Sequence, residues 1–290
     1  MSKKRITSLD KNKGGLRKFG IRAQKSLGQN FLIDEVVSET IINAADLKST
    51  DTVVEVGPGL GVLTERLVCN AGKVIAIEID SYLSKKLQKR LSQWQNLDII
   101  NSDILKLDIN FLLKSYQEYK VVANIPYYIT SPILHCFMQA KLKPSLMVVM
   151  MQEEVAQAIV AVPGKMSYLS VSMQIYSMPH IVCHVPAKSF YPMPKVNSAV
   201  VKFDMLPKPA VIVDDMTGFL QFIQCGFAAP RKQLHNSLSL GLKMATSDII
   251  RSLEDAGINP QRRAESLSLN EWQMLYNSIN SIVVRSNKPC

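Results

Sequence analysis

Short apolar runs that alternate with amphipathic stretches, from Asp34 to about Lys202, constrain the fold of this chain more than any other feature. Such alternation is typical of a doubly wound, mainly parallel sheet with helices on its faces. Two later segments alternate polar and apolar residues, as an antiparallel pair would. Strands apolar on both faces are predicted at Thr52 to Val56, Lys73 to Ile79, Leu97 to Ile100, Lys120 to Ala123 and Leu146 to Met151, and the late pair at His180 to Val185 and Ser198 to Asp204.

The pattern changes after Pro207 and Pro209, where strand signals end. Amphipathic stretches separated by Gly, Ser and Pro follow, which indicates a small helical domain. We therefore predict a basic leader over 1–24, a catalytic domain over 25–207 and a helical domain over 208–290. Helices are predicted at Ser81 to Trp94, Tyr168 to Ser177, Met216 to Phe227, Lys232 to Lys243, Ser247 to Ala256 and Asn270 to Ile282.

Positive charge is concentrated at the amino terminus. The net charge is +10, and residues 1–30 hold nine basic residues and one acid. Such a stretch can neutralise phosphates, or it can be a solvated tail that aids solubility. The leader residues predicted to bind RNA are Lys3, Lys4, Arg5, Arg17, Lys18 and Arg22.

Composition excludes several classes of protein. No apolar run approaches the roughly 20 residues that cross a bilayer, and no apolar stretch follows the first basic residues as in a secretion signal. The five cysteines are scattered without a C-x-x-C pair, so we expect neither disulfides nor a metal site. The chain is expected to be a cytoplasmic monomer.

A glycine-rich loop, Glu55-Val56-Gly57-Pro58-Gly59-Leu60-Gly61, follows the first predicted strand. Glycines permit a tight turn and a close approach to a ligand beside a helix amino terminus. The spacing G-x-G-x-G differs from the G-x-G-x-x-G of dinucleotide-binding proteins. It therefore favours S-adenosylmethionine over NAD as the cofactor, although a plain tight turn has the same pattern.

Two acids and an amide end the next three strands, where ligands bind in open α/β sheets. Glu78 can accept hydrogen bonds from ribose hydroxyls, and Asp103 can accept one from an adenine amine. Each acid taken alone could instead cap a helix or lie in a solvated turn. Their joint placement with Asn124 favours the ligand-binding interpretation.

The turn Asn124-Ile125-Pro126-Tyr127 indicates the reaction type. The exocyclic amine of adenine is a poor nucleophile because its lone pair is delocalised into the ring. The Asn124 side-chain oxygen and the Ile125 carbonyl could both accept hydrogen bonds from this amine, which would localise the lone pair. Tyr127 could stack on the base and hold it in place. The same four residues could also form a simple turn after a strand.

These residues together resemble the KsgA family of ribosomal RNA adenine dimethyltransferases. The resemblance runs from Gln24 to about Leu240 and includes Lys25-Ser26-Leu27-Gly28-Gln29-Asn30-Phe31-Leu32 and Phe190-Tyr191-Pro192-Met193-Pro194-Lys195. It implies an α/β, Rossmann-like methyltransferase domain with a mainly parallel seven-stranded sheet, followed by a small all-α domain. It also implies dimethylation of two adjacent adenines in the 3′-terminal hairpin loop of small-subunit ribosomal RNA, within an assembling 30S particle.

The resemblance implies roles for individual residues. Phe190 would stack on the target base opposite Tyr127, so the catalytic residues would be Asn124, Ile125, Pro126, Tyr127 and Phe190. The residues implied to bind S-adenosylmethionine are Asn30, Leu32, Glu55, Gly57, Gly59, Glu78, Asp103 and Asn124. Further RNA-binding residues would be Lys195, Arg231 and Lys232. The family usually has paired basic residues before the lysine that matches Lys232, whereas Pro230 holds one of those places here.

Three other functions are compatible with parts of the pattern. The related class that dimethylates one adenine of large-subunit RNA and confers macrolide resistance shares the Asn124 turn and the Pro192-x-Pro194-Lys195 stretch. A subunit-assembly checkpoint factor would use the basic leader for binding, with methylation secondary. A nicotinamide dehydrogenase would need a different glycine spacing and no Asn124 turn.

Overall fold

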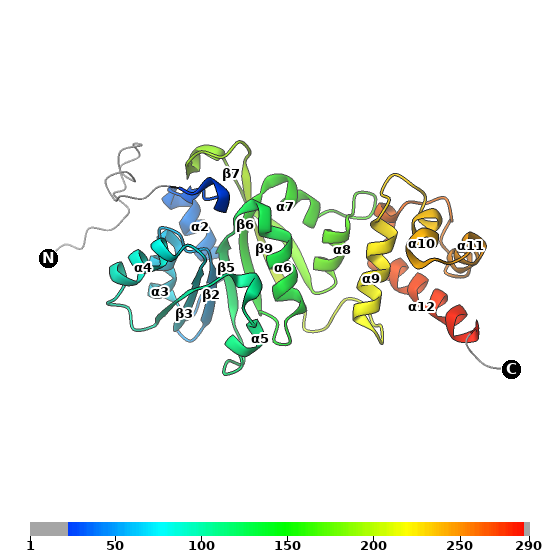
Figure 1. The fold of residues 1–290 in the computed structure, drawn as a ribbon, viewed down its shortest axis with the longest axis horizontal. Helices are drawn as coiled ribbons and strands as arrows, with labels where there is room; N and C mark the ends of the chain where they lie inside the picture. The colour runs from blue at the N-terminus through cyan, green and yellow to red at the C-terminus, as the bar shows by residue number, and fades with distance from the viewer. Residues whose placement is uncertain (1–22, 287–290) are drawn as a thin grey trace. The chain divides into compact units, whose positions relative to one another are not determined.

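A computed structural model describes residues 23–286 of the chain (Figure 1). The chain forms two compact units. The first contains the described residues up to Ala156 together with Pro179–Met205. The second contains Gln157–Met178 and the described residues from Leu206 onward. Residues 157–178, which lie within the predicted catalytic domain, are therefore in the helical unit. The predicted leader lies almost wholly outside the described residues.

The first unit is built on a seven-stranded sheet with the order β4-β3-β2-β5-β6-β9-β7. Its neighbouring strands from β4 to β6 pair in parallel, and β9 pairs antiparallel with β6. This arrangement confirms the predicted α/β fold with a mainly parallel sheet. The strands are β2 (Thr52–Val56), β3 (Lys73–Glu78), β4 (Leu97–Asn101), β5 (Lys120–Asn124), β6 (Leu146–Gln152), β7 (Ser177–Val185) and β9 (Ser198–Met205).

Both faces of the central strands are buried. Val53, Val122 and Val148 belong to a core cluster with residues of α2 (Glu35–Ala45) and α3 (Val62–Asn70). Their neighbours in sequence point to the opposite face and are also buried, which explains the continuous apolar runs in these strands. Packing on both faces therefore fixes the positions of the central strands and of their carboxyl ends.

The prediction that every parallel strand is buried on both faces is wrong for β4. Among the described strands it pairs with β3 alone, and each of its residues is partly buried or exposed, with Asp98 on the surface in an ion pair with Lys73. An edge strand has one neighbour and less cover, so its side chains reach water. The predicted helix at Ser81 to Trp94 is shorter in the structure, α4 (Ser81–Arg90), and Leu91 is its buried C-cap.

A second, two-stranded sheet escaped prediction. β1 (Phe31–Leu32) pairs antiparallel with β8 (Phe190–Tyr191), so residues 31–32 lie beside residues 190–191. The remaining elements, in chain order, are η2 (Lys25–Leu27), η3 (Ile104–Lys106), α5 (Ile109–Leu112), η4 (Tyr127–Ile129), α6 (Thr130–Gln139), α7 (Glu153–Ile159) and η5 (Ala187–Ser189).

The second unit is helical and packs around Trp272, which is fully buried. Phe222 and Phe227 contact its indole ring, and a Cβ at Gly226 would collide with that ring, so the close packing there requires glycine. The described helices are α8 (Tyr168–Gln174), α9 (Met216–Phe227), α10 (Leu234–Leu242), α11 (Thr246–Asp255), η6 (Ala264–Ser266) and α12 (Leu269–Ser286). Among the described helices, none has the length and apolar character to cross a membrane.

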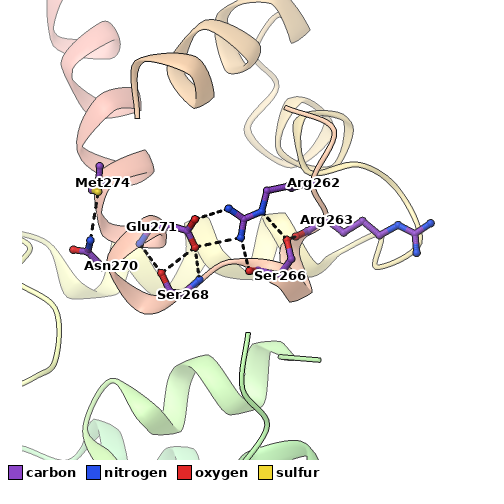
Figure 2. A network of polar contacts seen from close by, with 7 residues as sticks. All are labelled: Arg262, Arg263, Ser266, Ser268, Asn270, Glu271 and Met274. Atoms are coloured by element: carbon purple, nitrogen blue, oxygen red, sulfur yellow. Dashed lines mark hydrogen bonds and ion pairs between the residues drawn. The ribbon is translucent and has the colours of Figure 1, made fainter. Parts of the chain in front are cut away.

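A polar network fixes the start of α12 (Figure 2). Glu271 accepts hydrogen bonds from the backbone and hydroxyl of Ser268 and forms an ion pair with Arg262. The hydrogen bond from Arg262 is the main reason why the pKa of Glu271 is below its usual range. The carbonyl of Arg263 accepts from the Ser266 hydroxyl at 2.8 Å, whereas its side chain points away from this network and is exposed.

Candidate functional site

One pocket gathers all the residues predicted to bind the cofactor or the target amine. It lies at the carboxyl ends of β2, β3 and β5 and encloses about 1000 Å³, its open mouth included. The predicted residues that line it are Asn30, Leu32, Glu55, Gly57, Gly59, Glu78, Asp103, Asn124, Ile125, Pro126, Tyr127 and Phe190.

The glycine loop forms the turn from β2 into α3. Gly59 has a φ of +54°, and a Cβ there would lie 3.2 Å from the Phe31 ring. Gly61 is the N-cap of α3 with a φ of +75°, and a Cβ there would collide with Leu87 and Arg90. Only glycine tolerates both the left-handed backbone and the close neighbours. Close packing at Gly59 and Gly61 thus shapes the loop, and Gly59 lines the pocket together with Phe31.

Glu78 joins this loop to the turn after β3. Its two carboxylate oxygens accept hydrogen bonds from Gly59 N and Asp80 N, each at 2.9 Å. The side chain is buried, and this burial is the main reason why its pKa is raised. Each oxygen has a second lone pair, so Glu78 can still accept from a ligand's hydroxyls.

Asp103 combines a structural role with a place in the pocket. One of its oxygens accepts a hydrogen bond from Leu105 N at 3.0 Å and caps η3. The alternative that Asp103 is a helix cap is therefore confirmed, and it is compatible with ligand binding because a carboxylate has two oxygens.

Glu55 lies under the glycine loop and is 1% exposed. It accepts a hydrogen bond from the Thr64 hydroxyl at 2.7 Å. Burial raises its pKa to about 8, with a smaller contribution from the nearby Glu78. The raised pKa favours the protonated form of the Glu55 carboxyl at neutral pH, because burial disfavours a charge there.

Asn124 is the last residue of β5 and lines the pocket. Its side-chain Nδ2 donates to the Asn30 carbonyl at 3.4 Å, which orients the amide. Its Oδ1 accepts no hydrogen bond from the described residues, so this oxygen is available as an acceptor. Ile125 is buried and donates its backbone N–H to the Met150 carbonyl, which anchors the turn to β6.

Two aromatic rings adjoin this turn. The Tyr127 hydroxyl lies 2.7 Å from Ser198 Oγ, so β9 helps to fix the ring. Phe190 is only 3% exposed and packs with the core cluster while also lining the pocket. Stacking of Phe190 on a base stays a prediction.

Sequence reasoning missed several lining residues. Ile79 and Tyr128 are large, apolar and well exposed at the pocket, with exposed fractions of 46% and 57%. Both directly follow predicted site residues, and this adjacency was the signal that could have identified them. Gln29 and Phe31 also line the pocket from the amino-terminal segment.

The predicted RNA-binding residues are only partly described. Lys195 is exposed in the loop after β8, and Arg231 and Lys232 are exposed between α9 and α10. Lys3, Lys4, Arg5, Arg17, Lys18 and Arg22 lie outside the described residues. Within residues 23–286, no group of three or more His, Cys, Asp or Glu side chains could hold a metal ion.

The pocket fits S-adenosylmethionine. The glycine loop lets a ligand approach the backbone, Glu78 and Asp103 offer acceptors, and Ile79 and Leu83 offer apolar surface for a base. A parallel sheet with such a loop after its first strand and acids after the next two defines a Rossmann-like, S-adenosylmethionine-dependent methyltransferase.

Comparisons with known proteins identify the family. The family model described as ribosomal RNA adenine dimethylase matches residues 20–281, so the chain belongs to that family. A protein of Dehalococcoides mccartyi named ribosomal RNA small subunit methyltransferase A is 46% identical over 94% of this chain and 91% of its own length. A protein of Alkaliphilus metalliredigens with the same name is 41% identical over 93% of this chain and 96% of its own.

Two solved structures share most of the fold. A dimethyladenosine transferase from Plasmodium falciparum is 26% identical, with a TM-score of 0.74 over 87% of this chain and 98% of that one. The 23S rRNA methyltransferase ErmE is also 26% identical, with a TM-score of 0.68 over 87% of this chain and 100% of its own.

Replacement of Glu78 by Ala should weaken binding of S-adenosylhomocysteine by about 10- to 100-fold, because hydrogen bonds to a buried carboxylate are lost. The turnover number at saturating cofactor should change much less. Titration calorimetry measures the dissociation constant, and thermal unfolding checks that the variant is folded. A dissociation constant equal to that of a Tyr127→Ala variant would contradict the assignment of Glu78 to the cofactor.

Proposed function

We propose that this protein transfers methyl groups from S-adenosylmethionine to the N6 amine of adenines in small-subunit ribosomal RNA, giving N6,N6-dimethyladenine. One observation carries the proposal: the glycine loop, Glu78 and the Asn124 turn line the same pocket. A methyl donor held on one side of such a pocket lies within reach of an amine held on the other.

The residues of the Asn124 turn account for the chemistry. The bound cofactor supplies an electrophilic methyl group on a positively charged sulfur. Asn124 Oδ1 and the Ile125 carbonyl would accept hydrogen bonds from the two N–H groups of the amine. These bonds would localise the nitrogen lone pair and direct it toward the methyl group. The amine held in this way would take the methyl group as its bond to sulfur breaks, and the nitrogen would give up one proton to water. No strong base is needed because the nitrogen becomes acidic only as it is alkylated.

Tyr127 is assigned to hold the base. Replacement of Tyr127 by Ala should lower kcat by about 100-fold, because an unheld base seldom reaches the reactive geometry, while cofactor affinity changes little. Tyr127→Phe keeps the ring and loses only the contact with Ser198, so it should retain most of the activity. Single-turnover assays on immature small subunits measure both variants. Equal losses in the two would contradict a stacking role.

The small subunit is the proposed substrate because the curated relatives with 41–46% identity carry that name, whereas the 23S rRNA enzyme ErmE is 26% identical. We propose the finer target that the family resemblance implied: two adjacent adenines in the 3′-terminal hairpin loop, reached in an assembling 30S particle by a monomer. Four methyl transfers per particle would then consume four cofactor molecules.

Mass spectrometry of digested ribosomal RNA, with and without this protein, tests the proposal. The expected result is two N6,N6-dimethyladenines in the small-subunit RNA that depend on the protein. Dependence of a large-subunit mark alone would refute it and favour the macrolide-resistance class. Unchanged modification with altered subunit assembly would favour the checkpoint factor.

A further inference from the structure

The amino-terminal segment over 24–32 forms one wall of the pocket. Residues from Leu27 to Leu32 line it, although they are far in sequence from the glycine loop and from the Asn124 turn. Its carboxyl end is fixed by the pairing of β1 with β8 and by the hydrogen bond from Asn124 to Asn30. Its amino end is fixed elsewhere, at the start of α4.

Asp80 makes that second attachment. Its Oδ1 accepts from Tyr82 N and Leu83 N at 2.9 and 3.2 Å and caps α4. Its Oδ2 accepts from the side-chain amides of Gln24 and Gln29 at 2.8 and 3.0 Å. The carboxylate is 6% exposed, and four donors satisfy it. A helix cap needs only one of these oxygens, so the second serves the segment.

The two glutamines complete a closed arrangement. Gln24 N donates to Gln29 Oε1 at 2.8 Å, and both Nε2 atoms meet at Asp80 Oδ2. We call Gln24, Gln29 and Asp80 the clamp. Its hydrogen bonds to a charged and buried acceptor are stronger than those between neutral groups.

The clamp is joined to the proposed cofactor site. Asp80 N donates to Glu78 at 2.9 Å, so the residue that holds the segment also holds the carboxylate assigned to the cofactor. We propose that Asp80 and Gln24 are positioning residues that keep the amino-terminal segment closed on the bound cofactor and thereby set its rate of dissociation. The proposal rests on the assignment of this pocket to S-adenosylmethionine.

The part of the segment that the clamp holds has few other attachments. Phe31 and Leu32 are buried in the core, which fixes the carboxyl end, whereas Gln24 is exposed and residues 27–30 are only partly buried. Segments with few buried contacts open at low free-energy cost, and opening of such a wall exposes a ligand to water.

The variant Gln24→Glu tests the clamp. Gln24 is exposed and does not line the pocket, so a substitution there would affect cofactor binding only through the clamp. The new carboxylate would face that of Asp80. We expect dissociation of S-adenosylhomocysteine, followed by stopped flow, to become about tenfold faster. The KM for S-adenosylmethionine should rise with kcat nearly unchanged. Without cofactor, hydrogen exchange at the Leu27 and Gln29 amides should also become faster.

The double variant Gln24→Glu/Asp80→Asn supplies the rescue. Asparagine still caps a helix, and its amide can donate to the carboxylate at position 24, so slow dissociation should return. The control Gln117→Glu adds the same charge at an exposed residue of unit one and should leave the rate unchanged.

The outcomes separate the clamp from the site itself. Unchanged dissociation in Gln24→Glu, or faster dissociation that the double variant does not reverse, would overturn the clamp. Undiminished cofactor binding by Glu78→Ala would instead overturn the proposed site.

Discussion

Replacement of Asn124 by Ala should lower the rate of methyl transfer by about 100- to 1000-fold, the loss typical of removing one preorganised polar group at a reacting centre. Asn124 ends a strand that lies between β2 and β6, and its amide is oriented by the Asn30 carbonyl. The bond to the Asn30 carbonyl restrains the amide before the substrate arrives, and loss of Oδ1 would leave the amine with the Ile125 carbonyl as its remaining proposed acceptor.

Subunit binding should survive this substitution, and cofactor binding should weaken less than methyl transfer does, because Asn124 is one of several residues assigned to the cofactor. Single-turnover rates, calorimetry with S-adenosylhomocysteine and sedimentation with immature small subunits measure the three quantities separately. Asn124→Asp keeps an oxygen acceptor at the same place, so it should retain more activity than Asn124→Ala. Equal loss in both variants would argue against a role as acceptor. A variant that binds subunits without methylating them would show that binding and chemistry are separable.

Replacement of Glu55 by Gln should flatten the dependence of folding stability on pH. The folded-state pKa of Glu55 is raised to about 8 from 4.5, chiefly by burial. Between these values the folded protein holds a proton that the unfolded chain releases. Stability of the parent protein therefore falls as pH rises through this window, by up to about 1.4 kcal/mol per pH unit for this group.

Glutamine has nearly the same shape, stays neutral and can still accept from Thr64. Urea unfolding from pH 4.5 to 8.5 should show that Glu55→Gln gains stability relative to the parent as pH rises, by several kcal/mol at the alkaline end. The two proteins should be similar near pH 4.5, where Glu55 is protonated in the folded parent and partly in the unfolded chain. Parallel profiles over the whole range would show that Glu55 is already ionised in the folded protein.

The sequence predicted best those elements whose apolar pattern matches their packing. The strand Thr52–Val56 and the helix Met216–Phe227 have the predicted bounds, because the apolar run of the strand and the helical period of the helix end where packing ends. β4 was predicted as a buried strand because Leu97, Ile99 and Ile100 are apolar, yet its edge position decides its exposure. Strand order depends on pairings that one apolar run does not encode.

Long-range contacts explain the other differences. Two-residue strands such as β1 and β8 have no period to detect and form only by meeting each other. Residues 157–178 belong to the helical unit, where Gly164 N and Met166 N donate to the Glu265 carbonyl. The local sequence pattern around Gly164 does not indicate a hydrogen-bond partner about a hundred residues later in the chain.

The candidate site could be predicted from the sequence because its residues lie at successive strand ends. Topology brings the ends of β2, β3 and β5 together whatever the details of packing. The contribution of Asp80 and Gln24 could not be predicted, since an Asp before a helix is fully explained as a cap. The second use of its carboxylate is visible only in three dimensions.

The hydrogen bonds of Glu78 have a consequence for selectivity. Gly59 N and Asp80 N already restrain this side chain without ligand, so its rotamer entropy is lost during folding and not during binding. Under the proposed assignment, Glu78 would be a pre-set part of the nucleoside site, whereas the clamp would set how long the cofactor stays bound. A substitution at Gln24 would then change product release without changing which molecule is recognised.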